Sequence, residues 1–171
     1  MKIKGETCEE QLKNAIKMIN HYKYDSMTKL KGRIDFEEEL EKAFLNWQIN
    51  NDYFTLSIID LNDLKKENDS HGHLAGDKII RKLSNLLQST FKNKNLFRIG
   101  GDEFAILCTN NHRKKIKLDL DKILNENKDL FCYGIVESNE LLNNSTIADV
   151  FNFADHLLIN EKLNHKEKLR G

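Results

Sequence analysis

The chain has 171 residues, and its 27 lysine and arginine residues balance 27 aspartate and glutamate residues. This length suits one domain with a buried core, and the zero net charge argues against the basic surface that nucleic-acid binding requires. No apolar run approaches the roughly 20 residues of a membrane span, no signal-peptide core follows the N-terminus, and three cysteines without a C-x-x-C pair favour a reduced, cytoplasmic setting.

The first predicted element is an amphipathic helix at residues 5–24. Its apolar positions share the i, i+4, i+7 spacing of one helix face and are Leu12, Ile16 and Ile19. Such a helix either packs on its own domain or pairs with a second copy as a short coiled coil, and the shortness of the pattern favours packing. We divide the chain into two parts. Residues 1–24 form a leading helix that serves as a linker or dimerisation element, and residues 25–171 form the domain.

A second helix is predicted at about residues 34–50, after a polar break. The next run, residues 53–59, is apolar on both faces of a strand, which is typical of a central strand covered on both sides. It ends at Asp60, an edge position where functional sites usually lie. A polar, glycine-punctuated stretch follows at 61–77, and a single long helix is predicted at about 74–90.

A hairpin comes next, because strand-like runs at 95–99 and 104–108 flank Gly100-Gly101-Asp102-Glu103. Adjacent glycines predict a tight turn, since glycine reaches the positive φ values that such turns need. Glycines also let a ligand approach the backbone closely, and paired acids attract divalent metal. Because successive strand residues point to opposite faces, a given partner meets at most one of the two acids. The turn therefore suits a metal-bound phosphate.

The remaining elements are a helix at about 112–126, a strand at 130–136 and a final helix at about 147–163. Strands separated by helices, together with one hairpin, predict an α/β (α+β) domain whose mixed sheet is flanked by helices. The chain contains no internal repeat and no low-complexity segment.

Five segments resemble the GGDEF family of diguanylate cyclases, in the family's order and spacing. They are the G-G-D-E-F motif at 100–104, the D-x-L-T-G-L-x-N-R pattern matched at Asp25, Thr28, Leu30 and Arg33, the strand-end Asp60, the N-D-x-x-G-H-x-x-G-D signature at 68–77, and Ala154-Asp155 followed by Lys162. The resemblance covers about residues 25–166. It implies a fold similar to the palm of nucleotide cyclases and polymerases. It also implies condensation of two GTP into cyclic di-GMP and two pyrophosphates across an at least transient homodimer.

The resemblance further implies roles for individual residues. The Mg²⁺ (or Mn²⁺) ligands are Asp60, the main-chain carbonyl of Leu61, Asp102 and Glu103. The residues that contact guanine are Asn68 and Asp77, and those that bind phosphate are Lys65, Lys162 and Lys166. Catalytic roles fall to Asp102 and Glu103, with Asp102 our first choice for deprotonating the 3′-hydroxyl. An aspartate suits guanine because it accepts from N1–H and N2–H₂, a donor pair that adenine lacks on that edge.

The chain also departs from the family pattern. Lysine at 166 replaces an arginine, which keeps the charge but loses bidentate phosphate geometry, and Met27, Lys29 and Gly32 replace three residues of the first pattern. These changes support an alternative, a catalytically weak or inactive domain that serves as a GTP-binding or regulatory module. A hybrid cyclic dinucleotide synthase is disfavoured because Asp77 is present.

Regulation is expected to differ from that of many family members. The inhibitory R-x-x-D motif, expected nine residues before Gly100, reads Phe91-Lys92-Asn93-Lys94, so we expect no product inhibition through that site. Family members usually carry a sensory domain ahead of the cyclase, so we also expect an upstream sensory partner or domain.

Other chemistry-bearing residues have simpler interpretations. His71 and His73 could be imagined as a zinc pair, but zinc needs further convergent ligands. Four strand residues are expected in the core: Phe97, Phe104, Cys108 and Cys132. The basic cluster at 113–117 is interpreted as a solvated helix face.

Overall fold

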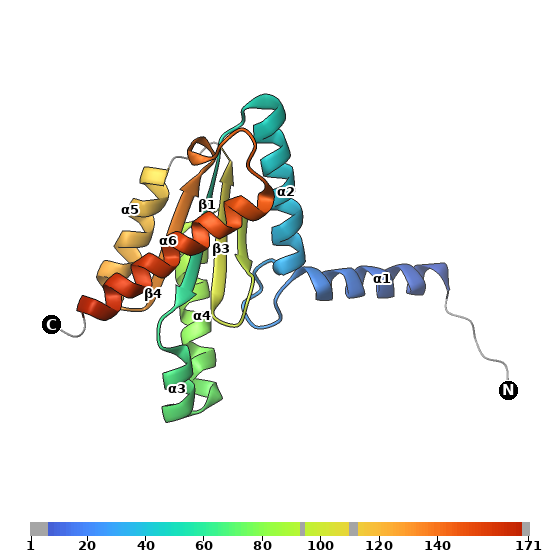
Figure 1. Ribbon diagram of the computed structural model, residues 1–171. Helices are drawn as coiled ribbons and strands as arrows, with labels where there is room; N and C mark the ends of the chain where they lie inside the picture. Colours follow the sequence, from blue (N-terminus) through green and yellow to red (C-terminus); the bar gives the residue numbers. More distant parts are fainter. Residues whose placement is uncertain (1–6, 93–94, 110–112, 169–171) are drawn as a thin grey trace.

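The structure is a computed structural model that describes residues 7–92, 95–109 and 113–168 (Figure 1). Its helices and strands, in chain order, are α1 Cys8–Lys23, α2 Arg33–Asn50, β1 Phe54–Leu61, α3 Leu64–His71, α4 His73–Thr90, β2 Asn95–Arg98, β3 Glu103–Thr109, α5 Arg113–Glu126, β4 Phe131–Glu137, the 3₁₀ helix η1 Ser138–Glu140, and α6 Ile147–Lys168. None of the helices in the described ranges is both long and apolar enough to cross a membrane.

The four strands form one sheet in the order β2-β3-β1-β4. Each neighbouring pair is antiparallel, so β1 and β2, which both flank β3, run in the same direction, as in a split β-α-β unit. A parallel component is present as an isolated bridge between Lys31 and Phe97 beside β2. The expected class, a mixed α/β sheet flanked by helices with a leading helix, is confirmed.

Helices cover both faces of the sheet. Side chains of α4 and α5, such as Leu83 and Leu120, share one apolar core with the sheet, and side chains of α2 and α6, such as Phe36 and Leu158, share the other. Every residue of β1 is buried, which confirms the central strand. The four strand residues expected in the core are all buried, namely Phe97, Phe104, Cys108 and Cys132.

The stretch at 61–77 contains a helix that the sequence did not predict. Helix α3 has no buried residue, so it lacks the apolar periodicity from which helices are recognised. It packs beside α4 as a helical hairpin, and the two extend together beyond the end of the sheet (Figure 1). Helix α4 begins at His73 and carries the apolar stripe.

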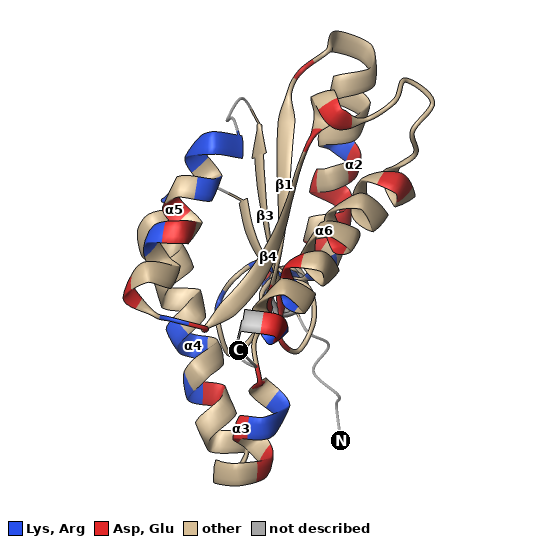
Figure 2. Cartoon of the chain, turned by 60° about the vertical axis from the view of Figure 1, so that its left-hand side comes forward, with Lys and Arg blue, Asp and Glu red and all other residues tan. Residues whose placement is uncertain are grey.

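Helix α6 is longer than predicted, whereas helix α5 has the predicted solvent-exposed face. Helix α6 reaches Lys168, five residues beyond the predicted end, because its last turns are polar and carry no apolar pattern. Helix α5 has the expected solvated face, since Lys115 and Lys117 pair with aspartates one turn ahead and opposite charges intermingle along it (Figure 2).

Helix α1 extends away from the rest of the chain (Figure 1). Thr7 caps its start, because the Thr7 hydroxyl accepts from the Glu10 N–H while the Glu10 carboxylate accepts from the Thr7 N–H. Leu12 and Ile16 remain 61% and 48% exposed. These two side chains are therefore not packed on the domain, which counts against the alternative that the short pattern favoured; the side chain of Ile19 lies outside the described residues.

Candidate functional site

Carboxylates from two neighbouring strands meet at one end of the sheet. Asp60, near the end of β1, is the register partner of Glu103, the first residue of β3. The Leu61 N–H donates to the Asp102 carbonyl at 3.0 Å, which fastens the hairpin tip to the end of β1. The strand-end aspartate therefore lies beside the start of the hairpin strand that carries the two acids.

The electrostatics of this cluster favour a bound cation. Burial raises the pKa of Asp60; Lys162 opposes this, and the charges of Asp102 and Asp155 add to it. Burial also raises the pKa of Glu103, and the charges of Asp60 and Asp102 raise it further. Like charges held close together in a partly desolvated site destabilise one another. A cation placed among these carboxylates would relieve that repulsion.

Lys162 supplies positive charge at this position in the structure. Its Nζ lies 2.8 Å from Asp60 Oδ2, so a residue predicted to bind phosphate contacts a residue predicted to bind metal. Among the described residues, no three histidine, cysteine, aspartate or glutamate side chains form a ready metal cluster. The donor set, carboxylates plus the Leu61 carbonyl, nevertheless has the hard oxygen chemistry that Mg²⁺ and Mn²⁺ prefer. Metal binding at Asp60 would require Lys162 to move.

A cavity of about 270 Å³ opens beside these carboxylates. It brings together six of the predicted metal and phosphate residues, which are Asp60, Leu61, Lys65, Asp102, Lys162 and Lys166. Whole small-molecule sites occupy roughly 300–1,000 Å³, so this cavity suits a polyphosphate with its counterions rather than a complete nucleotide.

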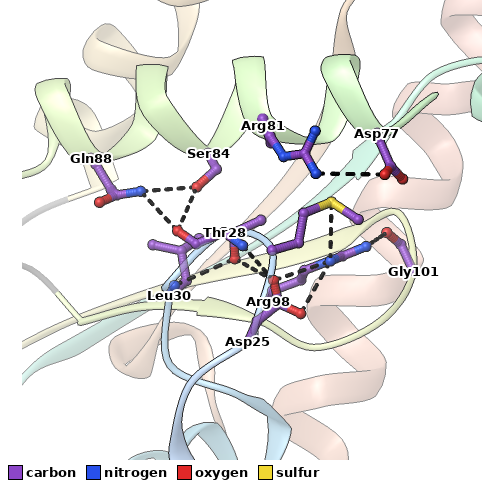
Figure 3. Close-up of polar contacts among 10 residues, drawn as sticks. Asp25, Thr28, Leu30, Asp77, Arg81, Ser84, Gln88, Arg98 and Gly101 are labelled. Atoms are coloured by element: carbon purple, nitrogen blue, oxygen red, sulfur yellow. Dashed lines mark hydrogen bonds and ion pairs between the residues drawn. The ribbon is translucent and has the colours of Figure 1, made fainter. Parts of the chain in front are cut away.

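The two predicted guanine residues lie outside this cavity lining, on the α3–α4 hairpin. Asn68 Oδ1 is buried and has no hydrogen-bond partner within the described chain. A Cβ added at Gly76 would lie 2.1 Å from that oxygen, so the glycine leaves room for the amide. Asp77, the next residue, lies 3.6 Å from Arg81 (Oδ2 to Nη2; Figure 3). An unpaired buried acceptor such as Asn68 Oδ1 is suited to a ligand with N–H donors.

An arginine that the sequence analysis did not assign connects the hairpin to the start of the domain (Figure 3). Arg98 Nη1 donates to both carboxylate oxygens of Asp25 at 3.1 Å, and its Nη2 donates to the Gly101 carbonyl at 2.8 Å. The Thr28 N–H and O–H both donate to Asp25 Oδ1 at 2.7 Å. The sequence does carry a signal for Arg98, since a charged residue between two apolar residues of a predicted strand, Phe97 and Ile99, needs a partner.

The turn glycines do not act as predicted. Gly72 has a φ of 81°, but neither Gly100 nor Gly101 has a positive φ, so the expected left-handed turn is wrong. The need for a glycine at position 100 is instead steric, because a Cβ there would lie 2.4 Å from Glu103 Oε2 and 3.2 Å from Glu103 Cβ. A Cβ at Gly101 would meet nothing within 4 Å.

Comparison with known families and proteins agrees with this geometry. A family profile described as "Diguanylate cyclase, GGDEF domain" matches residues 22–168. The chain is 33% identical over 89 residues to "Diguanylate cyclase DgcS" of Shewanella oneidensis, covering 52% of this chain and 30% of that protein. It is 32% identical over 114 residues to "Cyclic di-GMP phosphodiesterase PdeR" of Escherichia coli, covering 66% of this chain and 17% of that protein.

Among solved structures, the fold is similar to the coiled coil and GGDEF domain of DgcB from Caulobacter crescentus, crystallised with c-di-GMP. The TM-score is 0.79 at 20% identity, covering 91% of this chain and 89% of that chain. The chain spans less than a third of the length of the curated relatives DgcS and PdeR.

Proposed function

The chain belongs to the GGDEF domain family, and on that premise we propose that it is a diguanylate cyclase that condenses two GTP into cyclic di-GMP and two pyrophosphates. One observation carries this proposal. Asp60, Asp102 and Glu103 come together at the end of the sheet, beside a cavity that also holds Lys65, Lys162 and Lys166. Acids that hold metal and lysines that hold phosphate are what nucleotidyl transfer requires.

The acids have two roles at the reacting phosphate, which are metal binding and acceptance of a proton. Bound Mg²⁺ or Mn²⁺, held by Asp60, the Leu61 carbonyl, Asp102 and Glu103, would supply electrophilic activation of the triphosphate. Asp102 accepts the proton of the attacking 3′-hydroxyl, since a carboxylate near that group serves as a general base. Lys162 exchanges its contact with Asp60 for the substrate phosphates.

Guanine is recognised by the α3–α4 hairpin. The unpaired Asn68 Oδ1 accepts a guanine N–H, and the Asp77 carboxylate accepts from the N1–H and N2–H₂ edge. A site that hydrogen-bonds the base in this way rejects a base that lacks the partners by large factors. We therefore expect GTP to be preferred over ATP.

Each subunit supplies half of a catalytic centre, so two copies must face each other for the bond to form. We propose that residues 1–24, with α1 extended and Leu12 and Ile16 exposed, tune this dimerisation. Removing them should change how activity depends on protein concentration. An unchanged dependence in the product assay would count against that role.

The proposed function is tested by incubating purified protein with GTP and Mg²⁺ and separating the nucleotides by chromatography. We expect cyclic di-GMP, its loss in Asp102→Ala, and a severe reduction in Glu103→Ala. Absence of cyclic dinucleotide at high concentration of folded protein would reject the proposal. Tight product inhibition would contradict the expected lack of R-x-x-D feedback.

A second candidate function is a GTP-binding or regulatory module with weak or no turnover. It is favoured by the 2.8 Å contact of Lys162 with Asp60 and by lysine in place of arginine at 166. A relative named as a phosphodiesterase is consistent with it. GTP binding by calorimetry without product formation would support this alternative.

A further inference from the structure

A histidine with no role so far lines the same cavity. His165 lies on α6, three residues after Lys162 and next to Lys166. Its side chain is only 19% exposed, whereas Lys65 and Lys166 are exposed residues. A side chain already fixed by its surroundings loses less rotamer entropy when it binds a ligand. His165 is therefore the better preorganised member of the cavity's basic wall.

Asp129 is the acidic neighbour of the imidazole. Its Oδ1 lies 3.6 Å from His165 Nδ1. Asp129 has a left-handed backbone, with a φ of 59°, which is uncommon for a residue other than glycine. The side-chain amide of Asn62 donates to the Asp129 carbonyl at 3.1 Å, and the Asn62 N–H donates to the Leu130 carbonyl at 3.1 Å. The loop before β4 is thus fastened to the residue that follows β1, which keeps the backbone of Asp129 near α6.

The cavity offers a polyphosphate few donors that are not already engaged by its acids. Asp60, Asp63 and Asp102 line it alongside Lys65, Lys162 and Lys166, and Lys162 is engaged by Asp60. A polyphosphate entering this cavity would meet three carboxylates. A His165 ring N–H that donates to a phosphate oxygen would add a hydrogen bond to a charged acceptor, which is about twice as strong as a neutral one.

We propose that His165 is a substrate-phosphate residue, held by Asp129 so that Nε2 contacts the terminal phosphates of a guanine nucleoside triphosphate. The proposal rests on the proposed function only in taking this cavity as the phosphate site. Helix α6 rises about 1.5 Å per residue, so His165 lies about one turn farther along the cavity wall from Asp60 than Lys162 does. The contact therefore falls on the β- and γ-phosphates rather than on the reacting α-phosphate.

The test compares affinities for nucleotides that differ only in phosphate number. Calorimetry in Mg²⁺ measures binding of GMP and of a GTP analogue whose α,β-bridging oxygen is a methylene group. We expect His165→Gln to weaken binding of the analogue about tenfold, the size of one charge-assisted hydrogen bond, and to leave GMP binding unchanged. His156→Gln is the matched control, because His156 lies on α6 and is exposed, outside the cavity lining. It should change neither affinity.

Asp129→Asn gives a second test of the same proposal. Asparagine tolerates the left-handed backbone but carries no charge, so we expect a smaller loss of the same kind with an unchanged Tm. If His165 only braces α6 against the loop, His165→Gln will lower the Tm without changing the ratio of the two affinities, and the proposal is overturned. Failure of the wild-type protein to bind either nucleotide also overturns it.

The outcomes separate this inference from the proposed function. A changed affinity ratio in a protein that forms no cyclic di-GMP supports the role of His165 and rejects the cyclase. Formation of cyclic di-GMP with an unchanged ratio supports the cyclase and rejects the role of His165.

Discussion

Arg98 and Asp25 face each other although 73 positions separate them, and Arg98 Nη1 lies 3.1 Å from both carboxylate oxygens. Both side chains are largely buried. Because the same guanidinium also holds the Gly101 carbonyl at 2.8 Å, one residue ties the segment that follows α1 to the turn that carries Asp102. Arg98 therefore links the start of the domain to the turn that carries an acid of the site, beside the main-chain bridge between Lys31 and Phe97.

The first prediction concerns this arginine. Arg98→Lys keeps the charge, but one ammonium cannot bridge the carboxylate and the carbonyl as two guanidinium nitrogens do. We expect a loss of about 1.5–3 kcal/mol in the free energy of unfolding, since hydrogen bonds to charged groups contribute this much, and a larger proportional loss of cyclase activity. Urea unfolding and the product assay measure the two effects.

The control for Arg98→Lys is Lys115→Ala, which removes an exposed ion pair with Asp119. Exposed pairs contribute about 0–1 kcal/mol, so stability and activity should stay near wild type. Equal effects of the two substitutions would show that the Arg98 contact has no special importance.

The second prediction is a pH dependence. Burial by itself would raise the pKa of Asp25, but the hydrogen bonds from Thr28 and Arg98 and the arginine charge together lower it. A carboxylate whose pKa is lower in the folded state than its unfolded value, about 3.9, stabilises the fold above that value. This contribution is lost as the pH falls through the folded-state pKa.

Asp25→Asn tests this directly, because the amide does not titrate. The wild-type protein should be more stable than the variant near neutral pH, and the difference should shrink below about pH 4. Urea unfolding at a series of pH values gives the curve. A difference that stays constant down to pH 2.5 would mean that the Asp25 charge contributes nothing.

The third prediction concerns Lys162 as a cation within the acid cluster. Lys162→Ala removes the charge 2.8 Å from Asp60 and leaves the carboxylates to repel one another. Without divalent metal, the variant should have a lower Tm than wild type. Mn²⁺ should raise the Tm of the variant more than it raises the Tm of the wild-type protein, because an ion that binds the folded state stabilises it by mass action.

A charge-conserving variant separates this effect from lost packing. Lys162→Arg should keep the metal-free Tm near that of the wild-type protein. Thermal unfolding with and without Mn²⁺ is the measurement, and an identical response of all three proteins would exclude competition between Lys162 and the metal.

Much of the site was predictable because short motifs that resemble a known family carry it. The apolar run of β1 located Asp60, and the family resemblance grouped Asp60 with Glu103. The antiparallel pairing of β1 with β3 makes the two residues register partners. Helix α3 was not predictable in this way, since a helix without a buried side chain leaves no periodic signal. Arg98 and His165 were missed for a different reason. Their partners, Asp25 and Asp129, are 73 and 36 positions away, and no local pattern encodes such contacts.

The glycines of the hairpin provide the fourth prediction, because their sequence signal and their physical role differ. Both positions have a φ outside the left-handed region, so an alanine at either is compatible with the backbone. Only at Gly100 does an added Cβ meet another atom, at 2.4 Å from Glu103 Oε2. Gly100→Ala should therefore displace the Glu103 side chain and reduce cyclase activity, while Gly101→Ala should leave Tm and activity near wild type.

The two substitutions are matched, since each adds one methyl group to the same turn. Because the end of a flexible glutamate side chain can move at little cost, Gly100→Ala should change Tm only slightly, and its effect should appear in turnover and in the Mn²⁺ dependence of activity. If instead both variants lost stability to a similar extent, the turn would require glycine for its backbone conformation after all. If neither changed activity, Glu103 would not need its present position for catalysis.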